Sequence, residues 1–159
     1  MYYRSNLLYQ PGDRIDTGLY ARQILGFGPN HLQFFREYML EQIRKAEFPE
    51  RPSRLSVVFI YESFELSQRV RRSPIADEIT YRVTPVNADT LVCRLDMDWL
   101  THQLEHCHSF ECAEAIARKY WKGERAFPGS TTEMLVSGPV VIEERMTAIT
   151  ENGYKQESL

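Results

Sequence analysis

The chain has 159 residues, enough for one domain that buries about two thirds of its unfolded surface. Apolar residues make up 43% and charged residues 26%, and the net charge of -3 gives no electrostatic reason to expect nucleic acid or an anionic membrane as a partner. No stretch approaches the roughly 18 apolar residues that a membrane span needs. Three cysteines, with no signal peptide, predict reduced thiols in a cytoplasmic protein.

Hydrophobic periodicity predicts strands and helices in mixed order. We expect strands over residues 1–5, 54–61, 78–86, 90–95, 133–136 and 140–148. We expect helices over residues 31–46, 64–71, 99–107 and 110–121. This order indicates one α+β domain over residues 1–148, built on a mostly antiparallel sheet or on two sheets around a cleft, followed by a flexible tail over 149–159.

The helix over 31–46 has the clearest pattern, with Asn30 as its expected N-cap. Four apolar side chains at helical spacing are expected to face the core: Leu32, Phe35, Met39 and Ile43. Its expected solvated side carries charges: Arg36, Glu37, Arg44 and Glu47. In the helix over 110–121 we expect a buried face made of Phe110, Ala113, Ile116, Ala117 and Tyr120, and a stop at Gly123.

The expected strands pair with their neighbours in the chain. The run over 54–61 is almost continuously apolar and predicts a buried central strand. The strand over 78–86 is expected to turn at 87–89 and return over 90–95 as a hairpin. Gly138 and Pro139 are expected to separate the strand that Glu133 begins from its partner strand over 140–148.

A metal-like run lies at 101–108. His102, Glu105 and His106 match H-x-x-E-H, in which two histidines one helical turn apart share a zinc ion and the glutamate acts as base. The motif lacks an assignable third ligand. Plain surface histidines are therefore the stronger interpretation, and zinc hydrolysis the weaker one.

Three short segments with polar side chains lie at the starts or ends of expected strands. They are Tyr3-Arg4-Ser5, Tyr61-Glu62-Ser63 and Thr131-Thr132-Glu133. Their order resembles the Arg, Ser and Glu arrangement of ADP-ribosyltransferases, and the run from Thr131 to Val136 is similar to the Glu-containing strand of that superfamily. The chain as a whole resembles the DUF2441 proteins of bacteria and phages over roughly residues 1–145. Segments that carry this likeness include Phe35-Arg36-Glu37, Arg51-Pro52-Ser53-Arg54 and Tyr120-Trp121-Lys122-Gly123.

The resemblance implies split antiparallel sheets with flanking helices that clamp NAD in a central cleft. Arg4 would bind the phosphates, Tyr3 or Tyr61 would stack near the nicotinamide, and Ser63 would hold the strand geometry. Ser5 and Thr131 flank these positions as further cofactor contacts. Glu133 would be the catalytic residue, bonding the nicotinamide ribose and stabilising the oxocarbenium-like transition state.

One position departs from the arginine-modifying branch of that superfamily. Thr131 stands where those enzymes have a second glutamate, and a hydroxyl cannot serve as a base towards a guanidinium, which argues against arginine as the acceptor. Each residue also has an ordinary structural interpretation: Arg4 in a salt bridge, Ser63 as the N-cap of the next helix, and Glu133 as an edge-strand charge.

The sequence therefore supports three hypotheses. The first is an NAD-dependent ADP-ribosyltransferase or NAD glycohydrolase acting on a protein or nucleic-acid acceptor. The second is a catalytically silent member of the same fold that binds a nucleotide-like ligand or a protein partner. The third is the zinc hydrolase. No membrane partner is expected, and exposed sheet edges with many aromatic residues would allow a homodimer.

Overall fold

The computed structural model describes residues 1–70 and 79–146 of the chain. Its strands are β1 (Tyr2–Ser5), β2 (Arg14–Ile15), β3 (Val58–Ile60), β4 (Ile79–Pro85), β5 (Val92–Asp96), β6 (Thr132–Val136) and β7 (Val140–Met146). Its α-helices are α1 (Leu19–Phe27), α2 (Leu32–Glu47), α3 (Phe64–Arg69) and α4 (Phe110–Lys122). Short helical segments are η1 (Arg54–Ser56), η2 (Trp99–Gln103) and η3 (Leu104–His106). The predicted tail over 149–159 lies outside the described residues.

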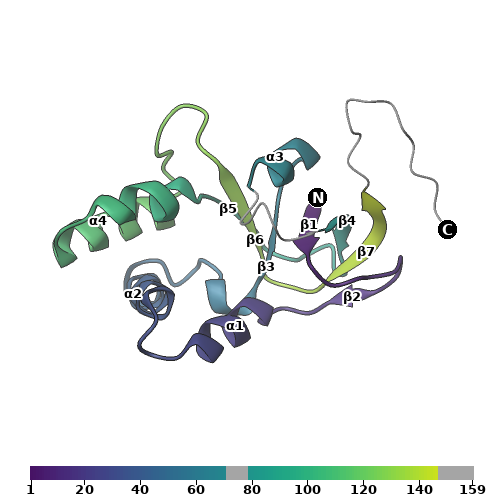
Figure 1. Cartoon of the computed structure of the whole chain (residues 1–159), viewed down its shortest axis with the longest axis horizontal. Helices are drawn as coiled ribbons and strands as arrows, with labels where there is room; N and C mark the ends of the chain where they lie inside the picture. Colours follow the sequence, from purple (N-terminus) through teal and green to yellow (C-terminus); the bar gives the residue numbers. More distant parts are fainter. Residues whose placement is uncertain (71–78, 147–159) are drawn as a thin grey trace.

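The strands form two antiparallel sheets, which confirms the α+β class. One sheet has the order β1-β4-β7-β2 and the other has the order β3-β6-β5. The backbones of Tyr2 and Tyr61 connect the sheets, with N–H···O distances of 2.9 and 2.7 Å. Helices α2 and α4 lie on the outer side of the three-stranded sheet, away from the four-stranded sheet (Figure 1). No helix among the described residues is long and apolar enough to cross a membrane.

The predicted pairing of neighbouring strands is wrong in two places. β4 pairs with β1 and β7, whereas β5 pairs with β6, so residues 87–91 connect different sheets rather than forming a hairpin. β6 and β7 also belong to different sheets, and Gly138 lies in the crossing between them. The apolar run that begins at Arg54 gives the short η1 followed by β3, which is an edge strand of its sheet rather than a central one. Alternation predicts strands, but it does not say which sheet each strand joins.

Two apolar cores lie on opposite faces of the three-stranded sheet. On β6, Met134 and Val136 pack with residues of the four-stranded sheet, whereas Leu135 packs with α2 and α4. Side chains alternate along a strand, so Glu133 shares the helix-facing side with Leu135. The position of β6 therefore directs the Glu133 carboxylate toward the helix layer.

The predicted buried sides of two helices are only partly correct. In α2 the buried residues are Glu37, Leu40 and Ile43, while Leu32 is 82% exposed. Its N-cap is His31, whose Nδ1 accepts from the Gln33 N–H, rather than Asn30.

In α4, Ile116, Ala117 and Tyr120 are buried as predicted, but Phe110 is 86% exposed. The helix stops at Gly123, which has a positive φ of 76° as a C-terminal glycine requires.

Candidate functional site

A cavity of about 420 Å³ lies where the two sheets meet, and four predicted cofactor contacts line it. These four are Tyr3, Arg4, Ser5 and Tyr61. The backbone bridge between Tyr2 and Tyr61 brings them together, because it holds β1 beside the end of β3. Helix α1 forms another wall of the cavity through Leu19, Tyr20 and Gln23. The volume of this cavity falls in the range of small-molecule sites, and its lining combines aromatic rings with several polar and charged groups.

Arg4 fixes one side of this cavity. Its Nη1 donates to the carbonyl oxygens of Ser67 at 3.0 Å and Val70 at 2.8 Å, at the C-terminal end of α3. Carbonyls at a helix C-terminus lack partners within the helix and carry partial negative charge. Arg4 therefore attaches α3 to β1, and its position on the cavity wall is set by the helix.

Two of the predicted cofactor contacts do not line the cavity. The Ser63 hydroxyl accepts from the Leu66 N–H at 3.1 Å, so Ser63 caps α3 as its structural interpretation predicts. The Thr131 N–H donates to Asp98 Oδ2 at 2.7 Å, and its carbonyl accepts from the Met97 N–H at 2.9 Å. Thr131 thus fixes the start of β6 against the end of β5.

Glu133 also lies outside the cavity lining, in a cluster of buried polar groups. It is 5% exposed, and its Oε1 accepts hydrogen bonds from Arg54 and, at 2.8 Å, from the Tyr120 hydroxyl. Arg54 is 6% exposed and also donates to Glu37 Oε2 at 2.9 Å. One guanidinium is therefore shared by two carboxylates from β6 and α2.

The charge states in this cluster follow from its burial and pairing. Burial opposes the charge of Arg54, but the carboxylates of Glu133 and Glu37 raise its pKa well above its ordinary value. Burial would raise the pKa of Glu37, yet Arg54 attracts and bonds the carboxylate and lowers that pKa below its ordinary value. Burial, with Glu133 beside it, raises the pKa of Tyr120 well above its ordinary value. At neutral pH the cluster is therefore a charged Arg54, an ionised Glu37 and a protonated Tyr120.

The cluster and the cavity share two aromatic side chains. Tyr20 lines the cavity and donates its hydroxyl hydrogen to Glu37 Oε1 at 2.8 Å. Phe59 lines the cavity and has its ring centroid 4.8 Å from Arg54 Cζ, within cation–π distance. The charged cluster thus lies behind the aromatic wall of the cavity.

Sequence reasoning missed Glu37, Arg54 and Tyr120 as members of this cluster. The sequence pattern predicts Glu37 on the solvated side of α2, Arg54 at a strand start, and Tyr120 among apolar core residues. The available signal was an arginine at the head of an otherwise apolar segment, because a charge that precedes a buried strand needs a buried counterion.

The H-x-x-E-H run is not carried by a regular α-helix. Residues Trp99–Gln103 form a π-helical turn and Leu104–His106 a 3-10 turn, so His102 and His106 are not spaced as one α-helical turn would place them. His102 Nε2 lies 3.7 Å from Asp98 Oδ1. Within residues 1–70 and 79–146, no group of three His, Cys, Asp or Glu side chains is arranged to hold a metal ion.

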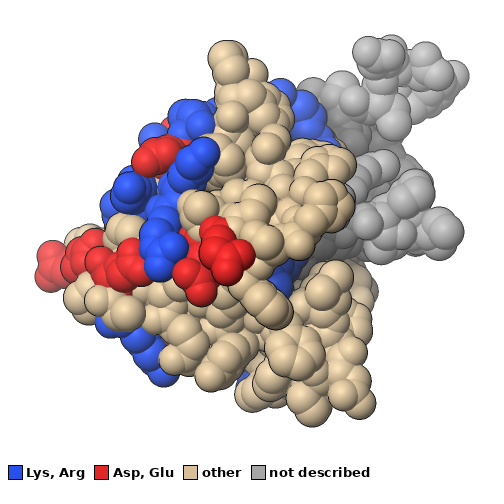
Figure 2. All heavy atoms as spheres, turned by 90° about the vertical axis from the view of Figure 1, so that its left-hand side faces the viewer, with Lys and Arg blue, Asp and Glu red and all other residues tan. Residues whose placement is uncertain are grey.

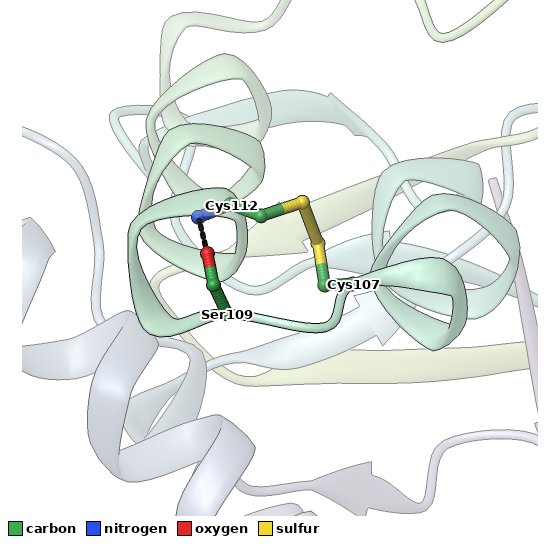
Figure 3. The surroundings of a disulfide bond; sticks show 3 residues. All are labelled: Cys107, Ser109 and Cys112. Atoms are coloured by element: carbon green, nitrogen blue, oxygen red, sulfur yellow. Dashed lines mark hydrogen bonds between the residues drawn. A yellow bond between two sulfur atoms is a disulfide. The ribbon is translucent and has the colours of Figure 1, made fainter.

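The prediction of three reduced thiols is wrong for two of the cysteines. Cys107 and Cys112 form a disulfide between η3 and the first turn of α4 (Figure 3). Cys93 is a free, buried cysteine. The odd cysteine count did not exclude a local pair, and the extended residues between η3 and α4 bring the two sulfurs together.

The outer helix face carries charges of both signs. Figure 2 shows the side of the molecule where α2 and α4 lie, with acidic and basic side chains next to one another. Arg118 of α4 bonds Glu47 of α2 at 2.9 Å and Glu114 at 3.3 Å. The Arg118–Glu47 pair joins α4 to α2 across this face.

Comparison with known proteins gives one family. Residues 15–148 match the family described as "Protein of unknown function (DUF2441)". The comparison with curated proteins found no match.

Proposed function

The chain belongs to the DUF2441 family, and we propose that it binds NAD in the cavity between the sheets and transfers ADP-ribose from it to a macromolecular acceptor or to water. One observation carries this proposal. Tyr3, Arg4 and Ser5 come from the first strand and Tyr61 from the end of β3, yet all four line one cavity. These are residues for which the ADP-ribosyltransferase resemblance implies contact with NAD.

The chemistry of the cavity suits a dinucleotide. The rings of Tyr3, Tyr20, Phe59 and Tyr61 offer faces for the adenine and nicotinamide bases. Arg4 supplies a positive charge for the pyrophosphate, and guanidinium groups suit phosphate oxygens. Asp16 at the cavity provides a carboxylate that accepts hydrogen bonds from ribose hydroxyls.

Glu133 has the catalytic role in this proposal. Positive charge develops on the nicotinamide ribose as the glycosidic bond breaks, and a nearby carboxylate stabilises that charge more in the transition state than in the ground state. Glu133 lies behind the aromatic wall of the cavity, so reaching the ribose requires it to leave both Arg54 and Tyr120, and requires Tyr20 or Phe59 to move aside. Arg54 has a second carboxylate partner, Glu37, so its charge stays paired during this movement.

A second candidate function is NAD binding without chemistry. It is favoured by the burial of Glu133, which is 5% exposed and bonded to both Arg54 and Tyr120. If these bonds persist with ligand bound, the carboxylate serves only the core, and the cavity is a binding site.

Ligand binding and nicotinamide release together separate these candidates. NAD binding would be measured by calorimetry for wild type, for Arg4→Gln in the cavity wall, and for Arg82→Gln, an exposed arginine of β4 paired with Glu143 and Glu144. We expect Arg4→Gln to weaken binding at least tenfold and Arg82→Gln to leave it within twofold. Equal affinity of the two variants, or no binding by wild type, would contradict both candidates.

The transfer step is tested by release of nicotinamide from NAD, with and without a cell lysate as acceptor. Wild type is expected to release it, and Glu133→Gln to lose release while still binding NAD. A matched control is Glu143→Gln, which alters a half-exposed carboxylate of β7. Binding without release by wild type supports the second candidate and overturns the first.

A further inference from the structure

The disulfide between Cys107 and Cys112 lies at the surface and differs in the burial of its two halves. Cys112 is exposed, whereas Cys107 is half-buried and packs against the core beneath α4. We propose that this pair is a site of reversible thiol–disulfide exchange with small thiols of the glutathione class. Cys112 is the sulfur that exchanges with the small thiol, and Cys107 is the sulfur that resolves the mixed disulfide.

The position of Cys112 on α4 suits an exchanging thiol. Ser109 caps the helix, and its hydroxyl accepts from the Cys112 N–H at 3.2 Å, as Figure 3 shows. Cys112 therefore belongs to the first turn of a 13-residue helix. The partial positive charge of a helix N-terminus stabilises a thiolate, and the thiolate is the nucleophile in exchange.

Opening this bond leaves the fold intact. The two cysteines are only 5 residues apart in sequence, so the bond closes a short loop and restricts the unfolded chain less than a long-range disulfide would. Helix α4 is held further along by Ile116, Ala117, Tyr120 and Trp121, all buried. A disulfide that closes a short loop and includes an exposed cysteine suits a reversible site.

The exchange balances as two displacements. In oxidation, the Cys112 thiolate attacks one sulfur of oxidised glutathione, forms a mixed disulfide and releases one glutathione thiolate. The Cys107 thiolate then attacks Cys112 Sγ, forms the internal disulfide and releases the second glutathione thiolate. Two protein thiols are oxidised and one small disulfide is reduced to two thiols. Reduction runs the same steps backwards, beginning with attack on the exposed Cys112.

The third cysteine provides an internal control. Cys93 is 4% exposed, and its sulfur accepts a hydrogen bond from Arg51 Nη1 at 3.2 Å. A thiol buried in β5 is not accessible to glutathione while the chain is folded. Cys93 is therefore expected to remain unmodified in every folded variant.

Single cysteine variants and oxidised glutathione test the proposal. Each reduced variant is incubated with oxidised glutathione, and the mixed disulfide is measured by intact mass and located by peptide mapping. In Cys107→Ser, Cys112 has no resolving partner, so we expect a trapped adduct of one glutathione at Cys112. In Cys112→Ser, the half-buried Cys107 is expected to react at least tenfold more slowly. Thermal melting of both variants confirms that they are folded during the reaction.

Wild type gives the complementary result. It should pass from the dithiol to the internal disulfide and back as the ratio of oxidised to reduced glutathione is changed, with its far-UV circular dichroism unchanged. Equal reaction of Cys107 and Cys112 in the single variants would overturn the assigned roles. A wild-type disulfide that opens only when the chain unfolds would overturn the exchange site itself. Neither result depends on NAD binding.

Discussion

Arg54 and Glu133 lie 79 residues apart in the sequence and form an ion pair that is almost completely buried. Glu37 of α2 bonds the same guanidinium from another side. Removing charges from water is costly, and a buried pair repays that cost only when its partners and hydrogen bonds are all present. The cluster therefore fixes three elements, η1, α2 and β6, relative to one another.

Loss of the Arg54 guanidinium should destabilise the fold strongly. Arg54→Met leaves the carboxylates of Glu37 and Glu133 buried without their cation. Breaking a buried pair in this way costs about 3–5 kcal/mol. Urea unfolding at pH 7 measures the difference from wild type.

The matched control for that variant is Arg118→Met on α4. Arg118 also bonds two carboxylates, Glu47 and Glu114, but its side chain is 38% exposed. Exposed pairs contribute about 0–1 kcal/mol. Similar losses in the two variants would contradict the view that burial gives the Arg54 cluster its importance.

The Tyr120 hydroxyl should contribute measurably to the same cluster. It donates to Glu133 Oε1 at 2.8 Å and accepts from Arg54, and the side chain is completely buried. Tyr120→Phe leaves one acceptor and one donor short of a partner, which costs about 1–3 kcal/mol in unfolding free energy. Tyr38→Phe removes a hydroxyl from a side chain that is 59% exposed and should change stability by less than about 0.5 kcal/mol. A Tyr120→Phe chain as stable as Tyr38→Phe would show that the hydroxyl is dispensable.

Acid should weaken the fold through Glu37. Its pKa in the folded chain is below the ordinary value of 4.5, because Arg54 holds the ionised form despite burial. The ionised form therefore stabilises the folded state above the ordinary pKa, and this stability is lost as pH falls through the lowered value. Between about pH 5 and about pH 3, wild type should lose more unfolding free energy than Glu37→Gln, which cannot titrate there. Equal pH dependence of the two chains, measured by urea unfolding, would rule out this contribution.

Local features of the fold follow from the sequence, because short-range chemistry decides them. Ser63 caps α3 and Gly123 ends α4, as the side-chain hydroxyl and the glycine predict. Sheet membership does not follow. The segments after β4 and after β6 look like turns in a hairpin, yet both cross to the other sheet. Which sheet a strand joins depends on how both faces of β6 are buried, against the helices on one side and the four-stranded sheet on the other. The sequence of one segment does not contain this information.

The sequence predicts part of the lining of the candidate cavity but not the buried charged cluster behind it. Tyr3, Arg4, Ser5 and Tyr61 line a common cavity, and their roles toward NAD stay predictions. The sequence indicates Glu133 as a candidate functional carboxylate, but it does not indicate that Arg54 is its partner. Arg54 and Glu133 are 79 residues apart, and tertiary packing brings them together. The residues around either one in the sequence therefore do not indicate which charge it pairs with.

A side chain at Gly138, in the crossing from β6 to β7, should press against the side chain of Thr90. A Cβ built there would lie 3.0 Å from Thr90 Oγ1 and 3.2 Å from Thr90 Cγ2. Gly138→Ala should therefore cost about 1–3 kcal/mol through overpacking, and adding Thr90→Ala should recover most of it by removing both atoms. Gly26→Ala in α1 is the control, because its Cβ would meet nothing within 4 Å and alanine favours a helix by about 1 kcal/mol. Thermal melting of the four chains gives the comparison. If the double variant melts no higher than Gly138→Ala alone, contact with Thr90 is not the reason that glycine occupies the crossing.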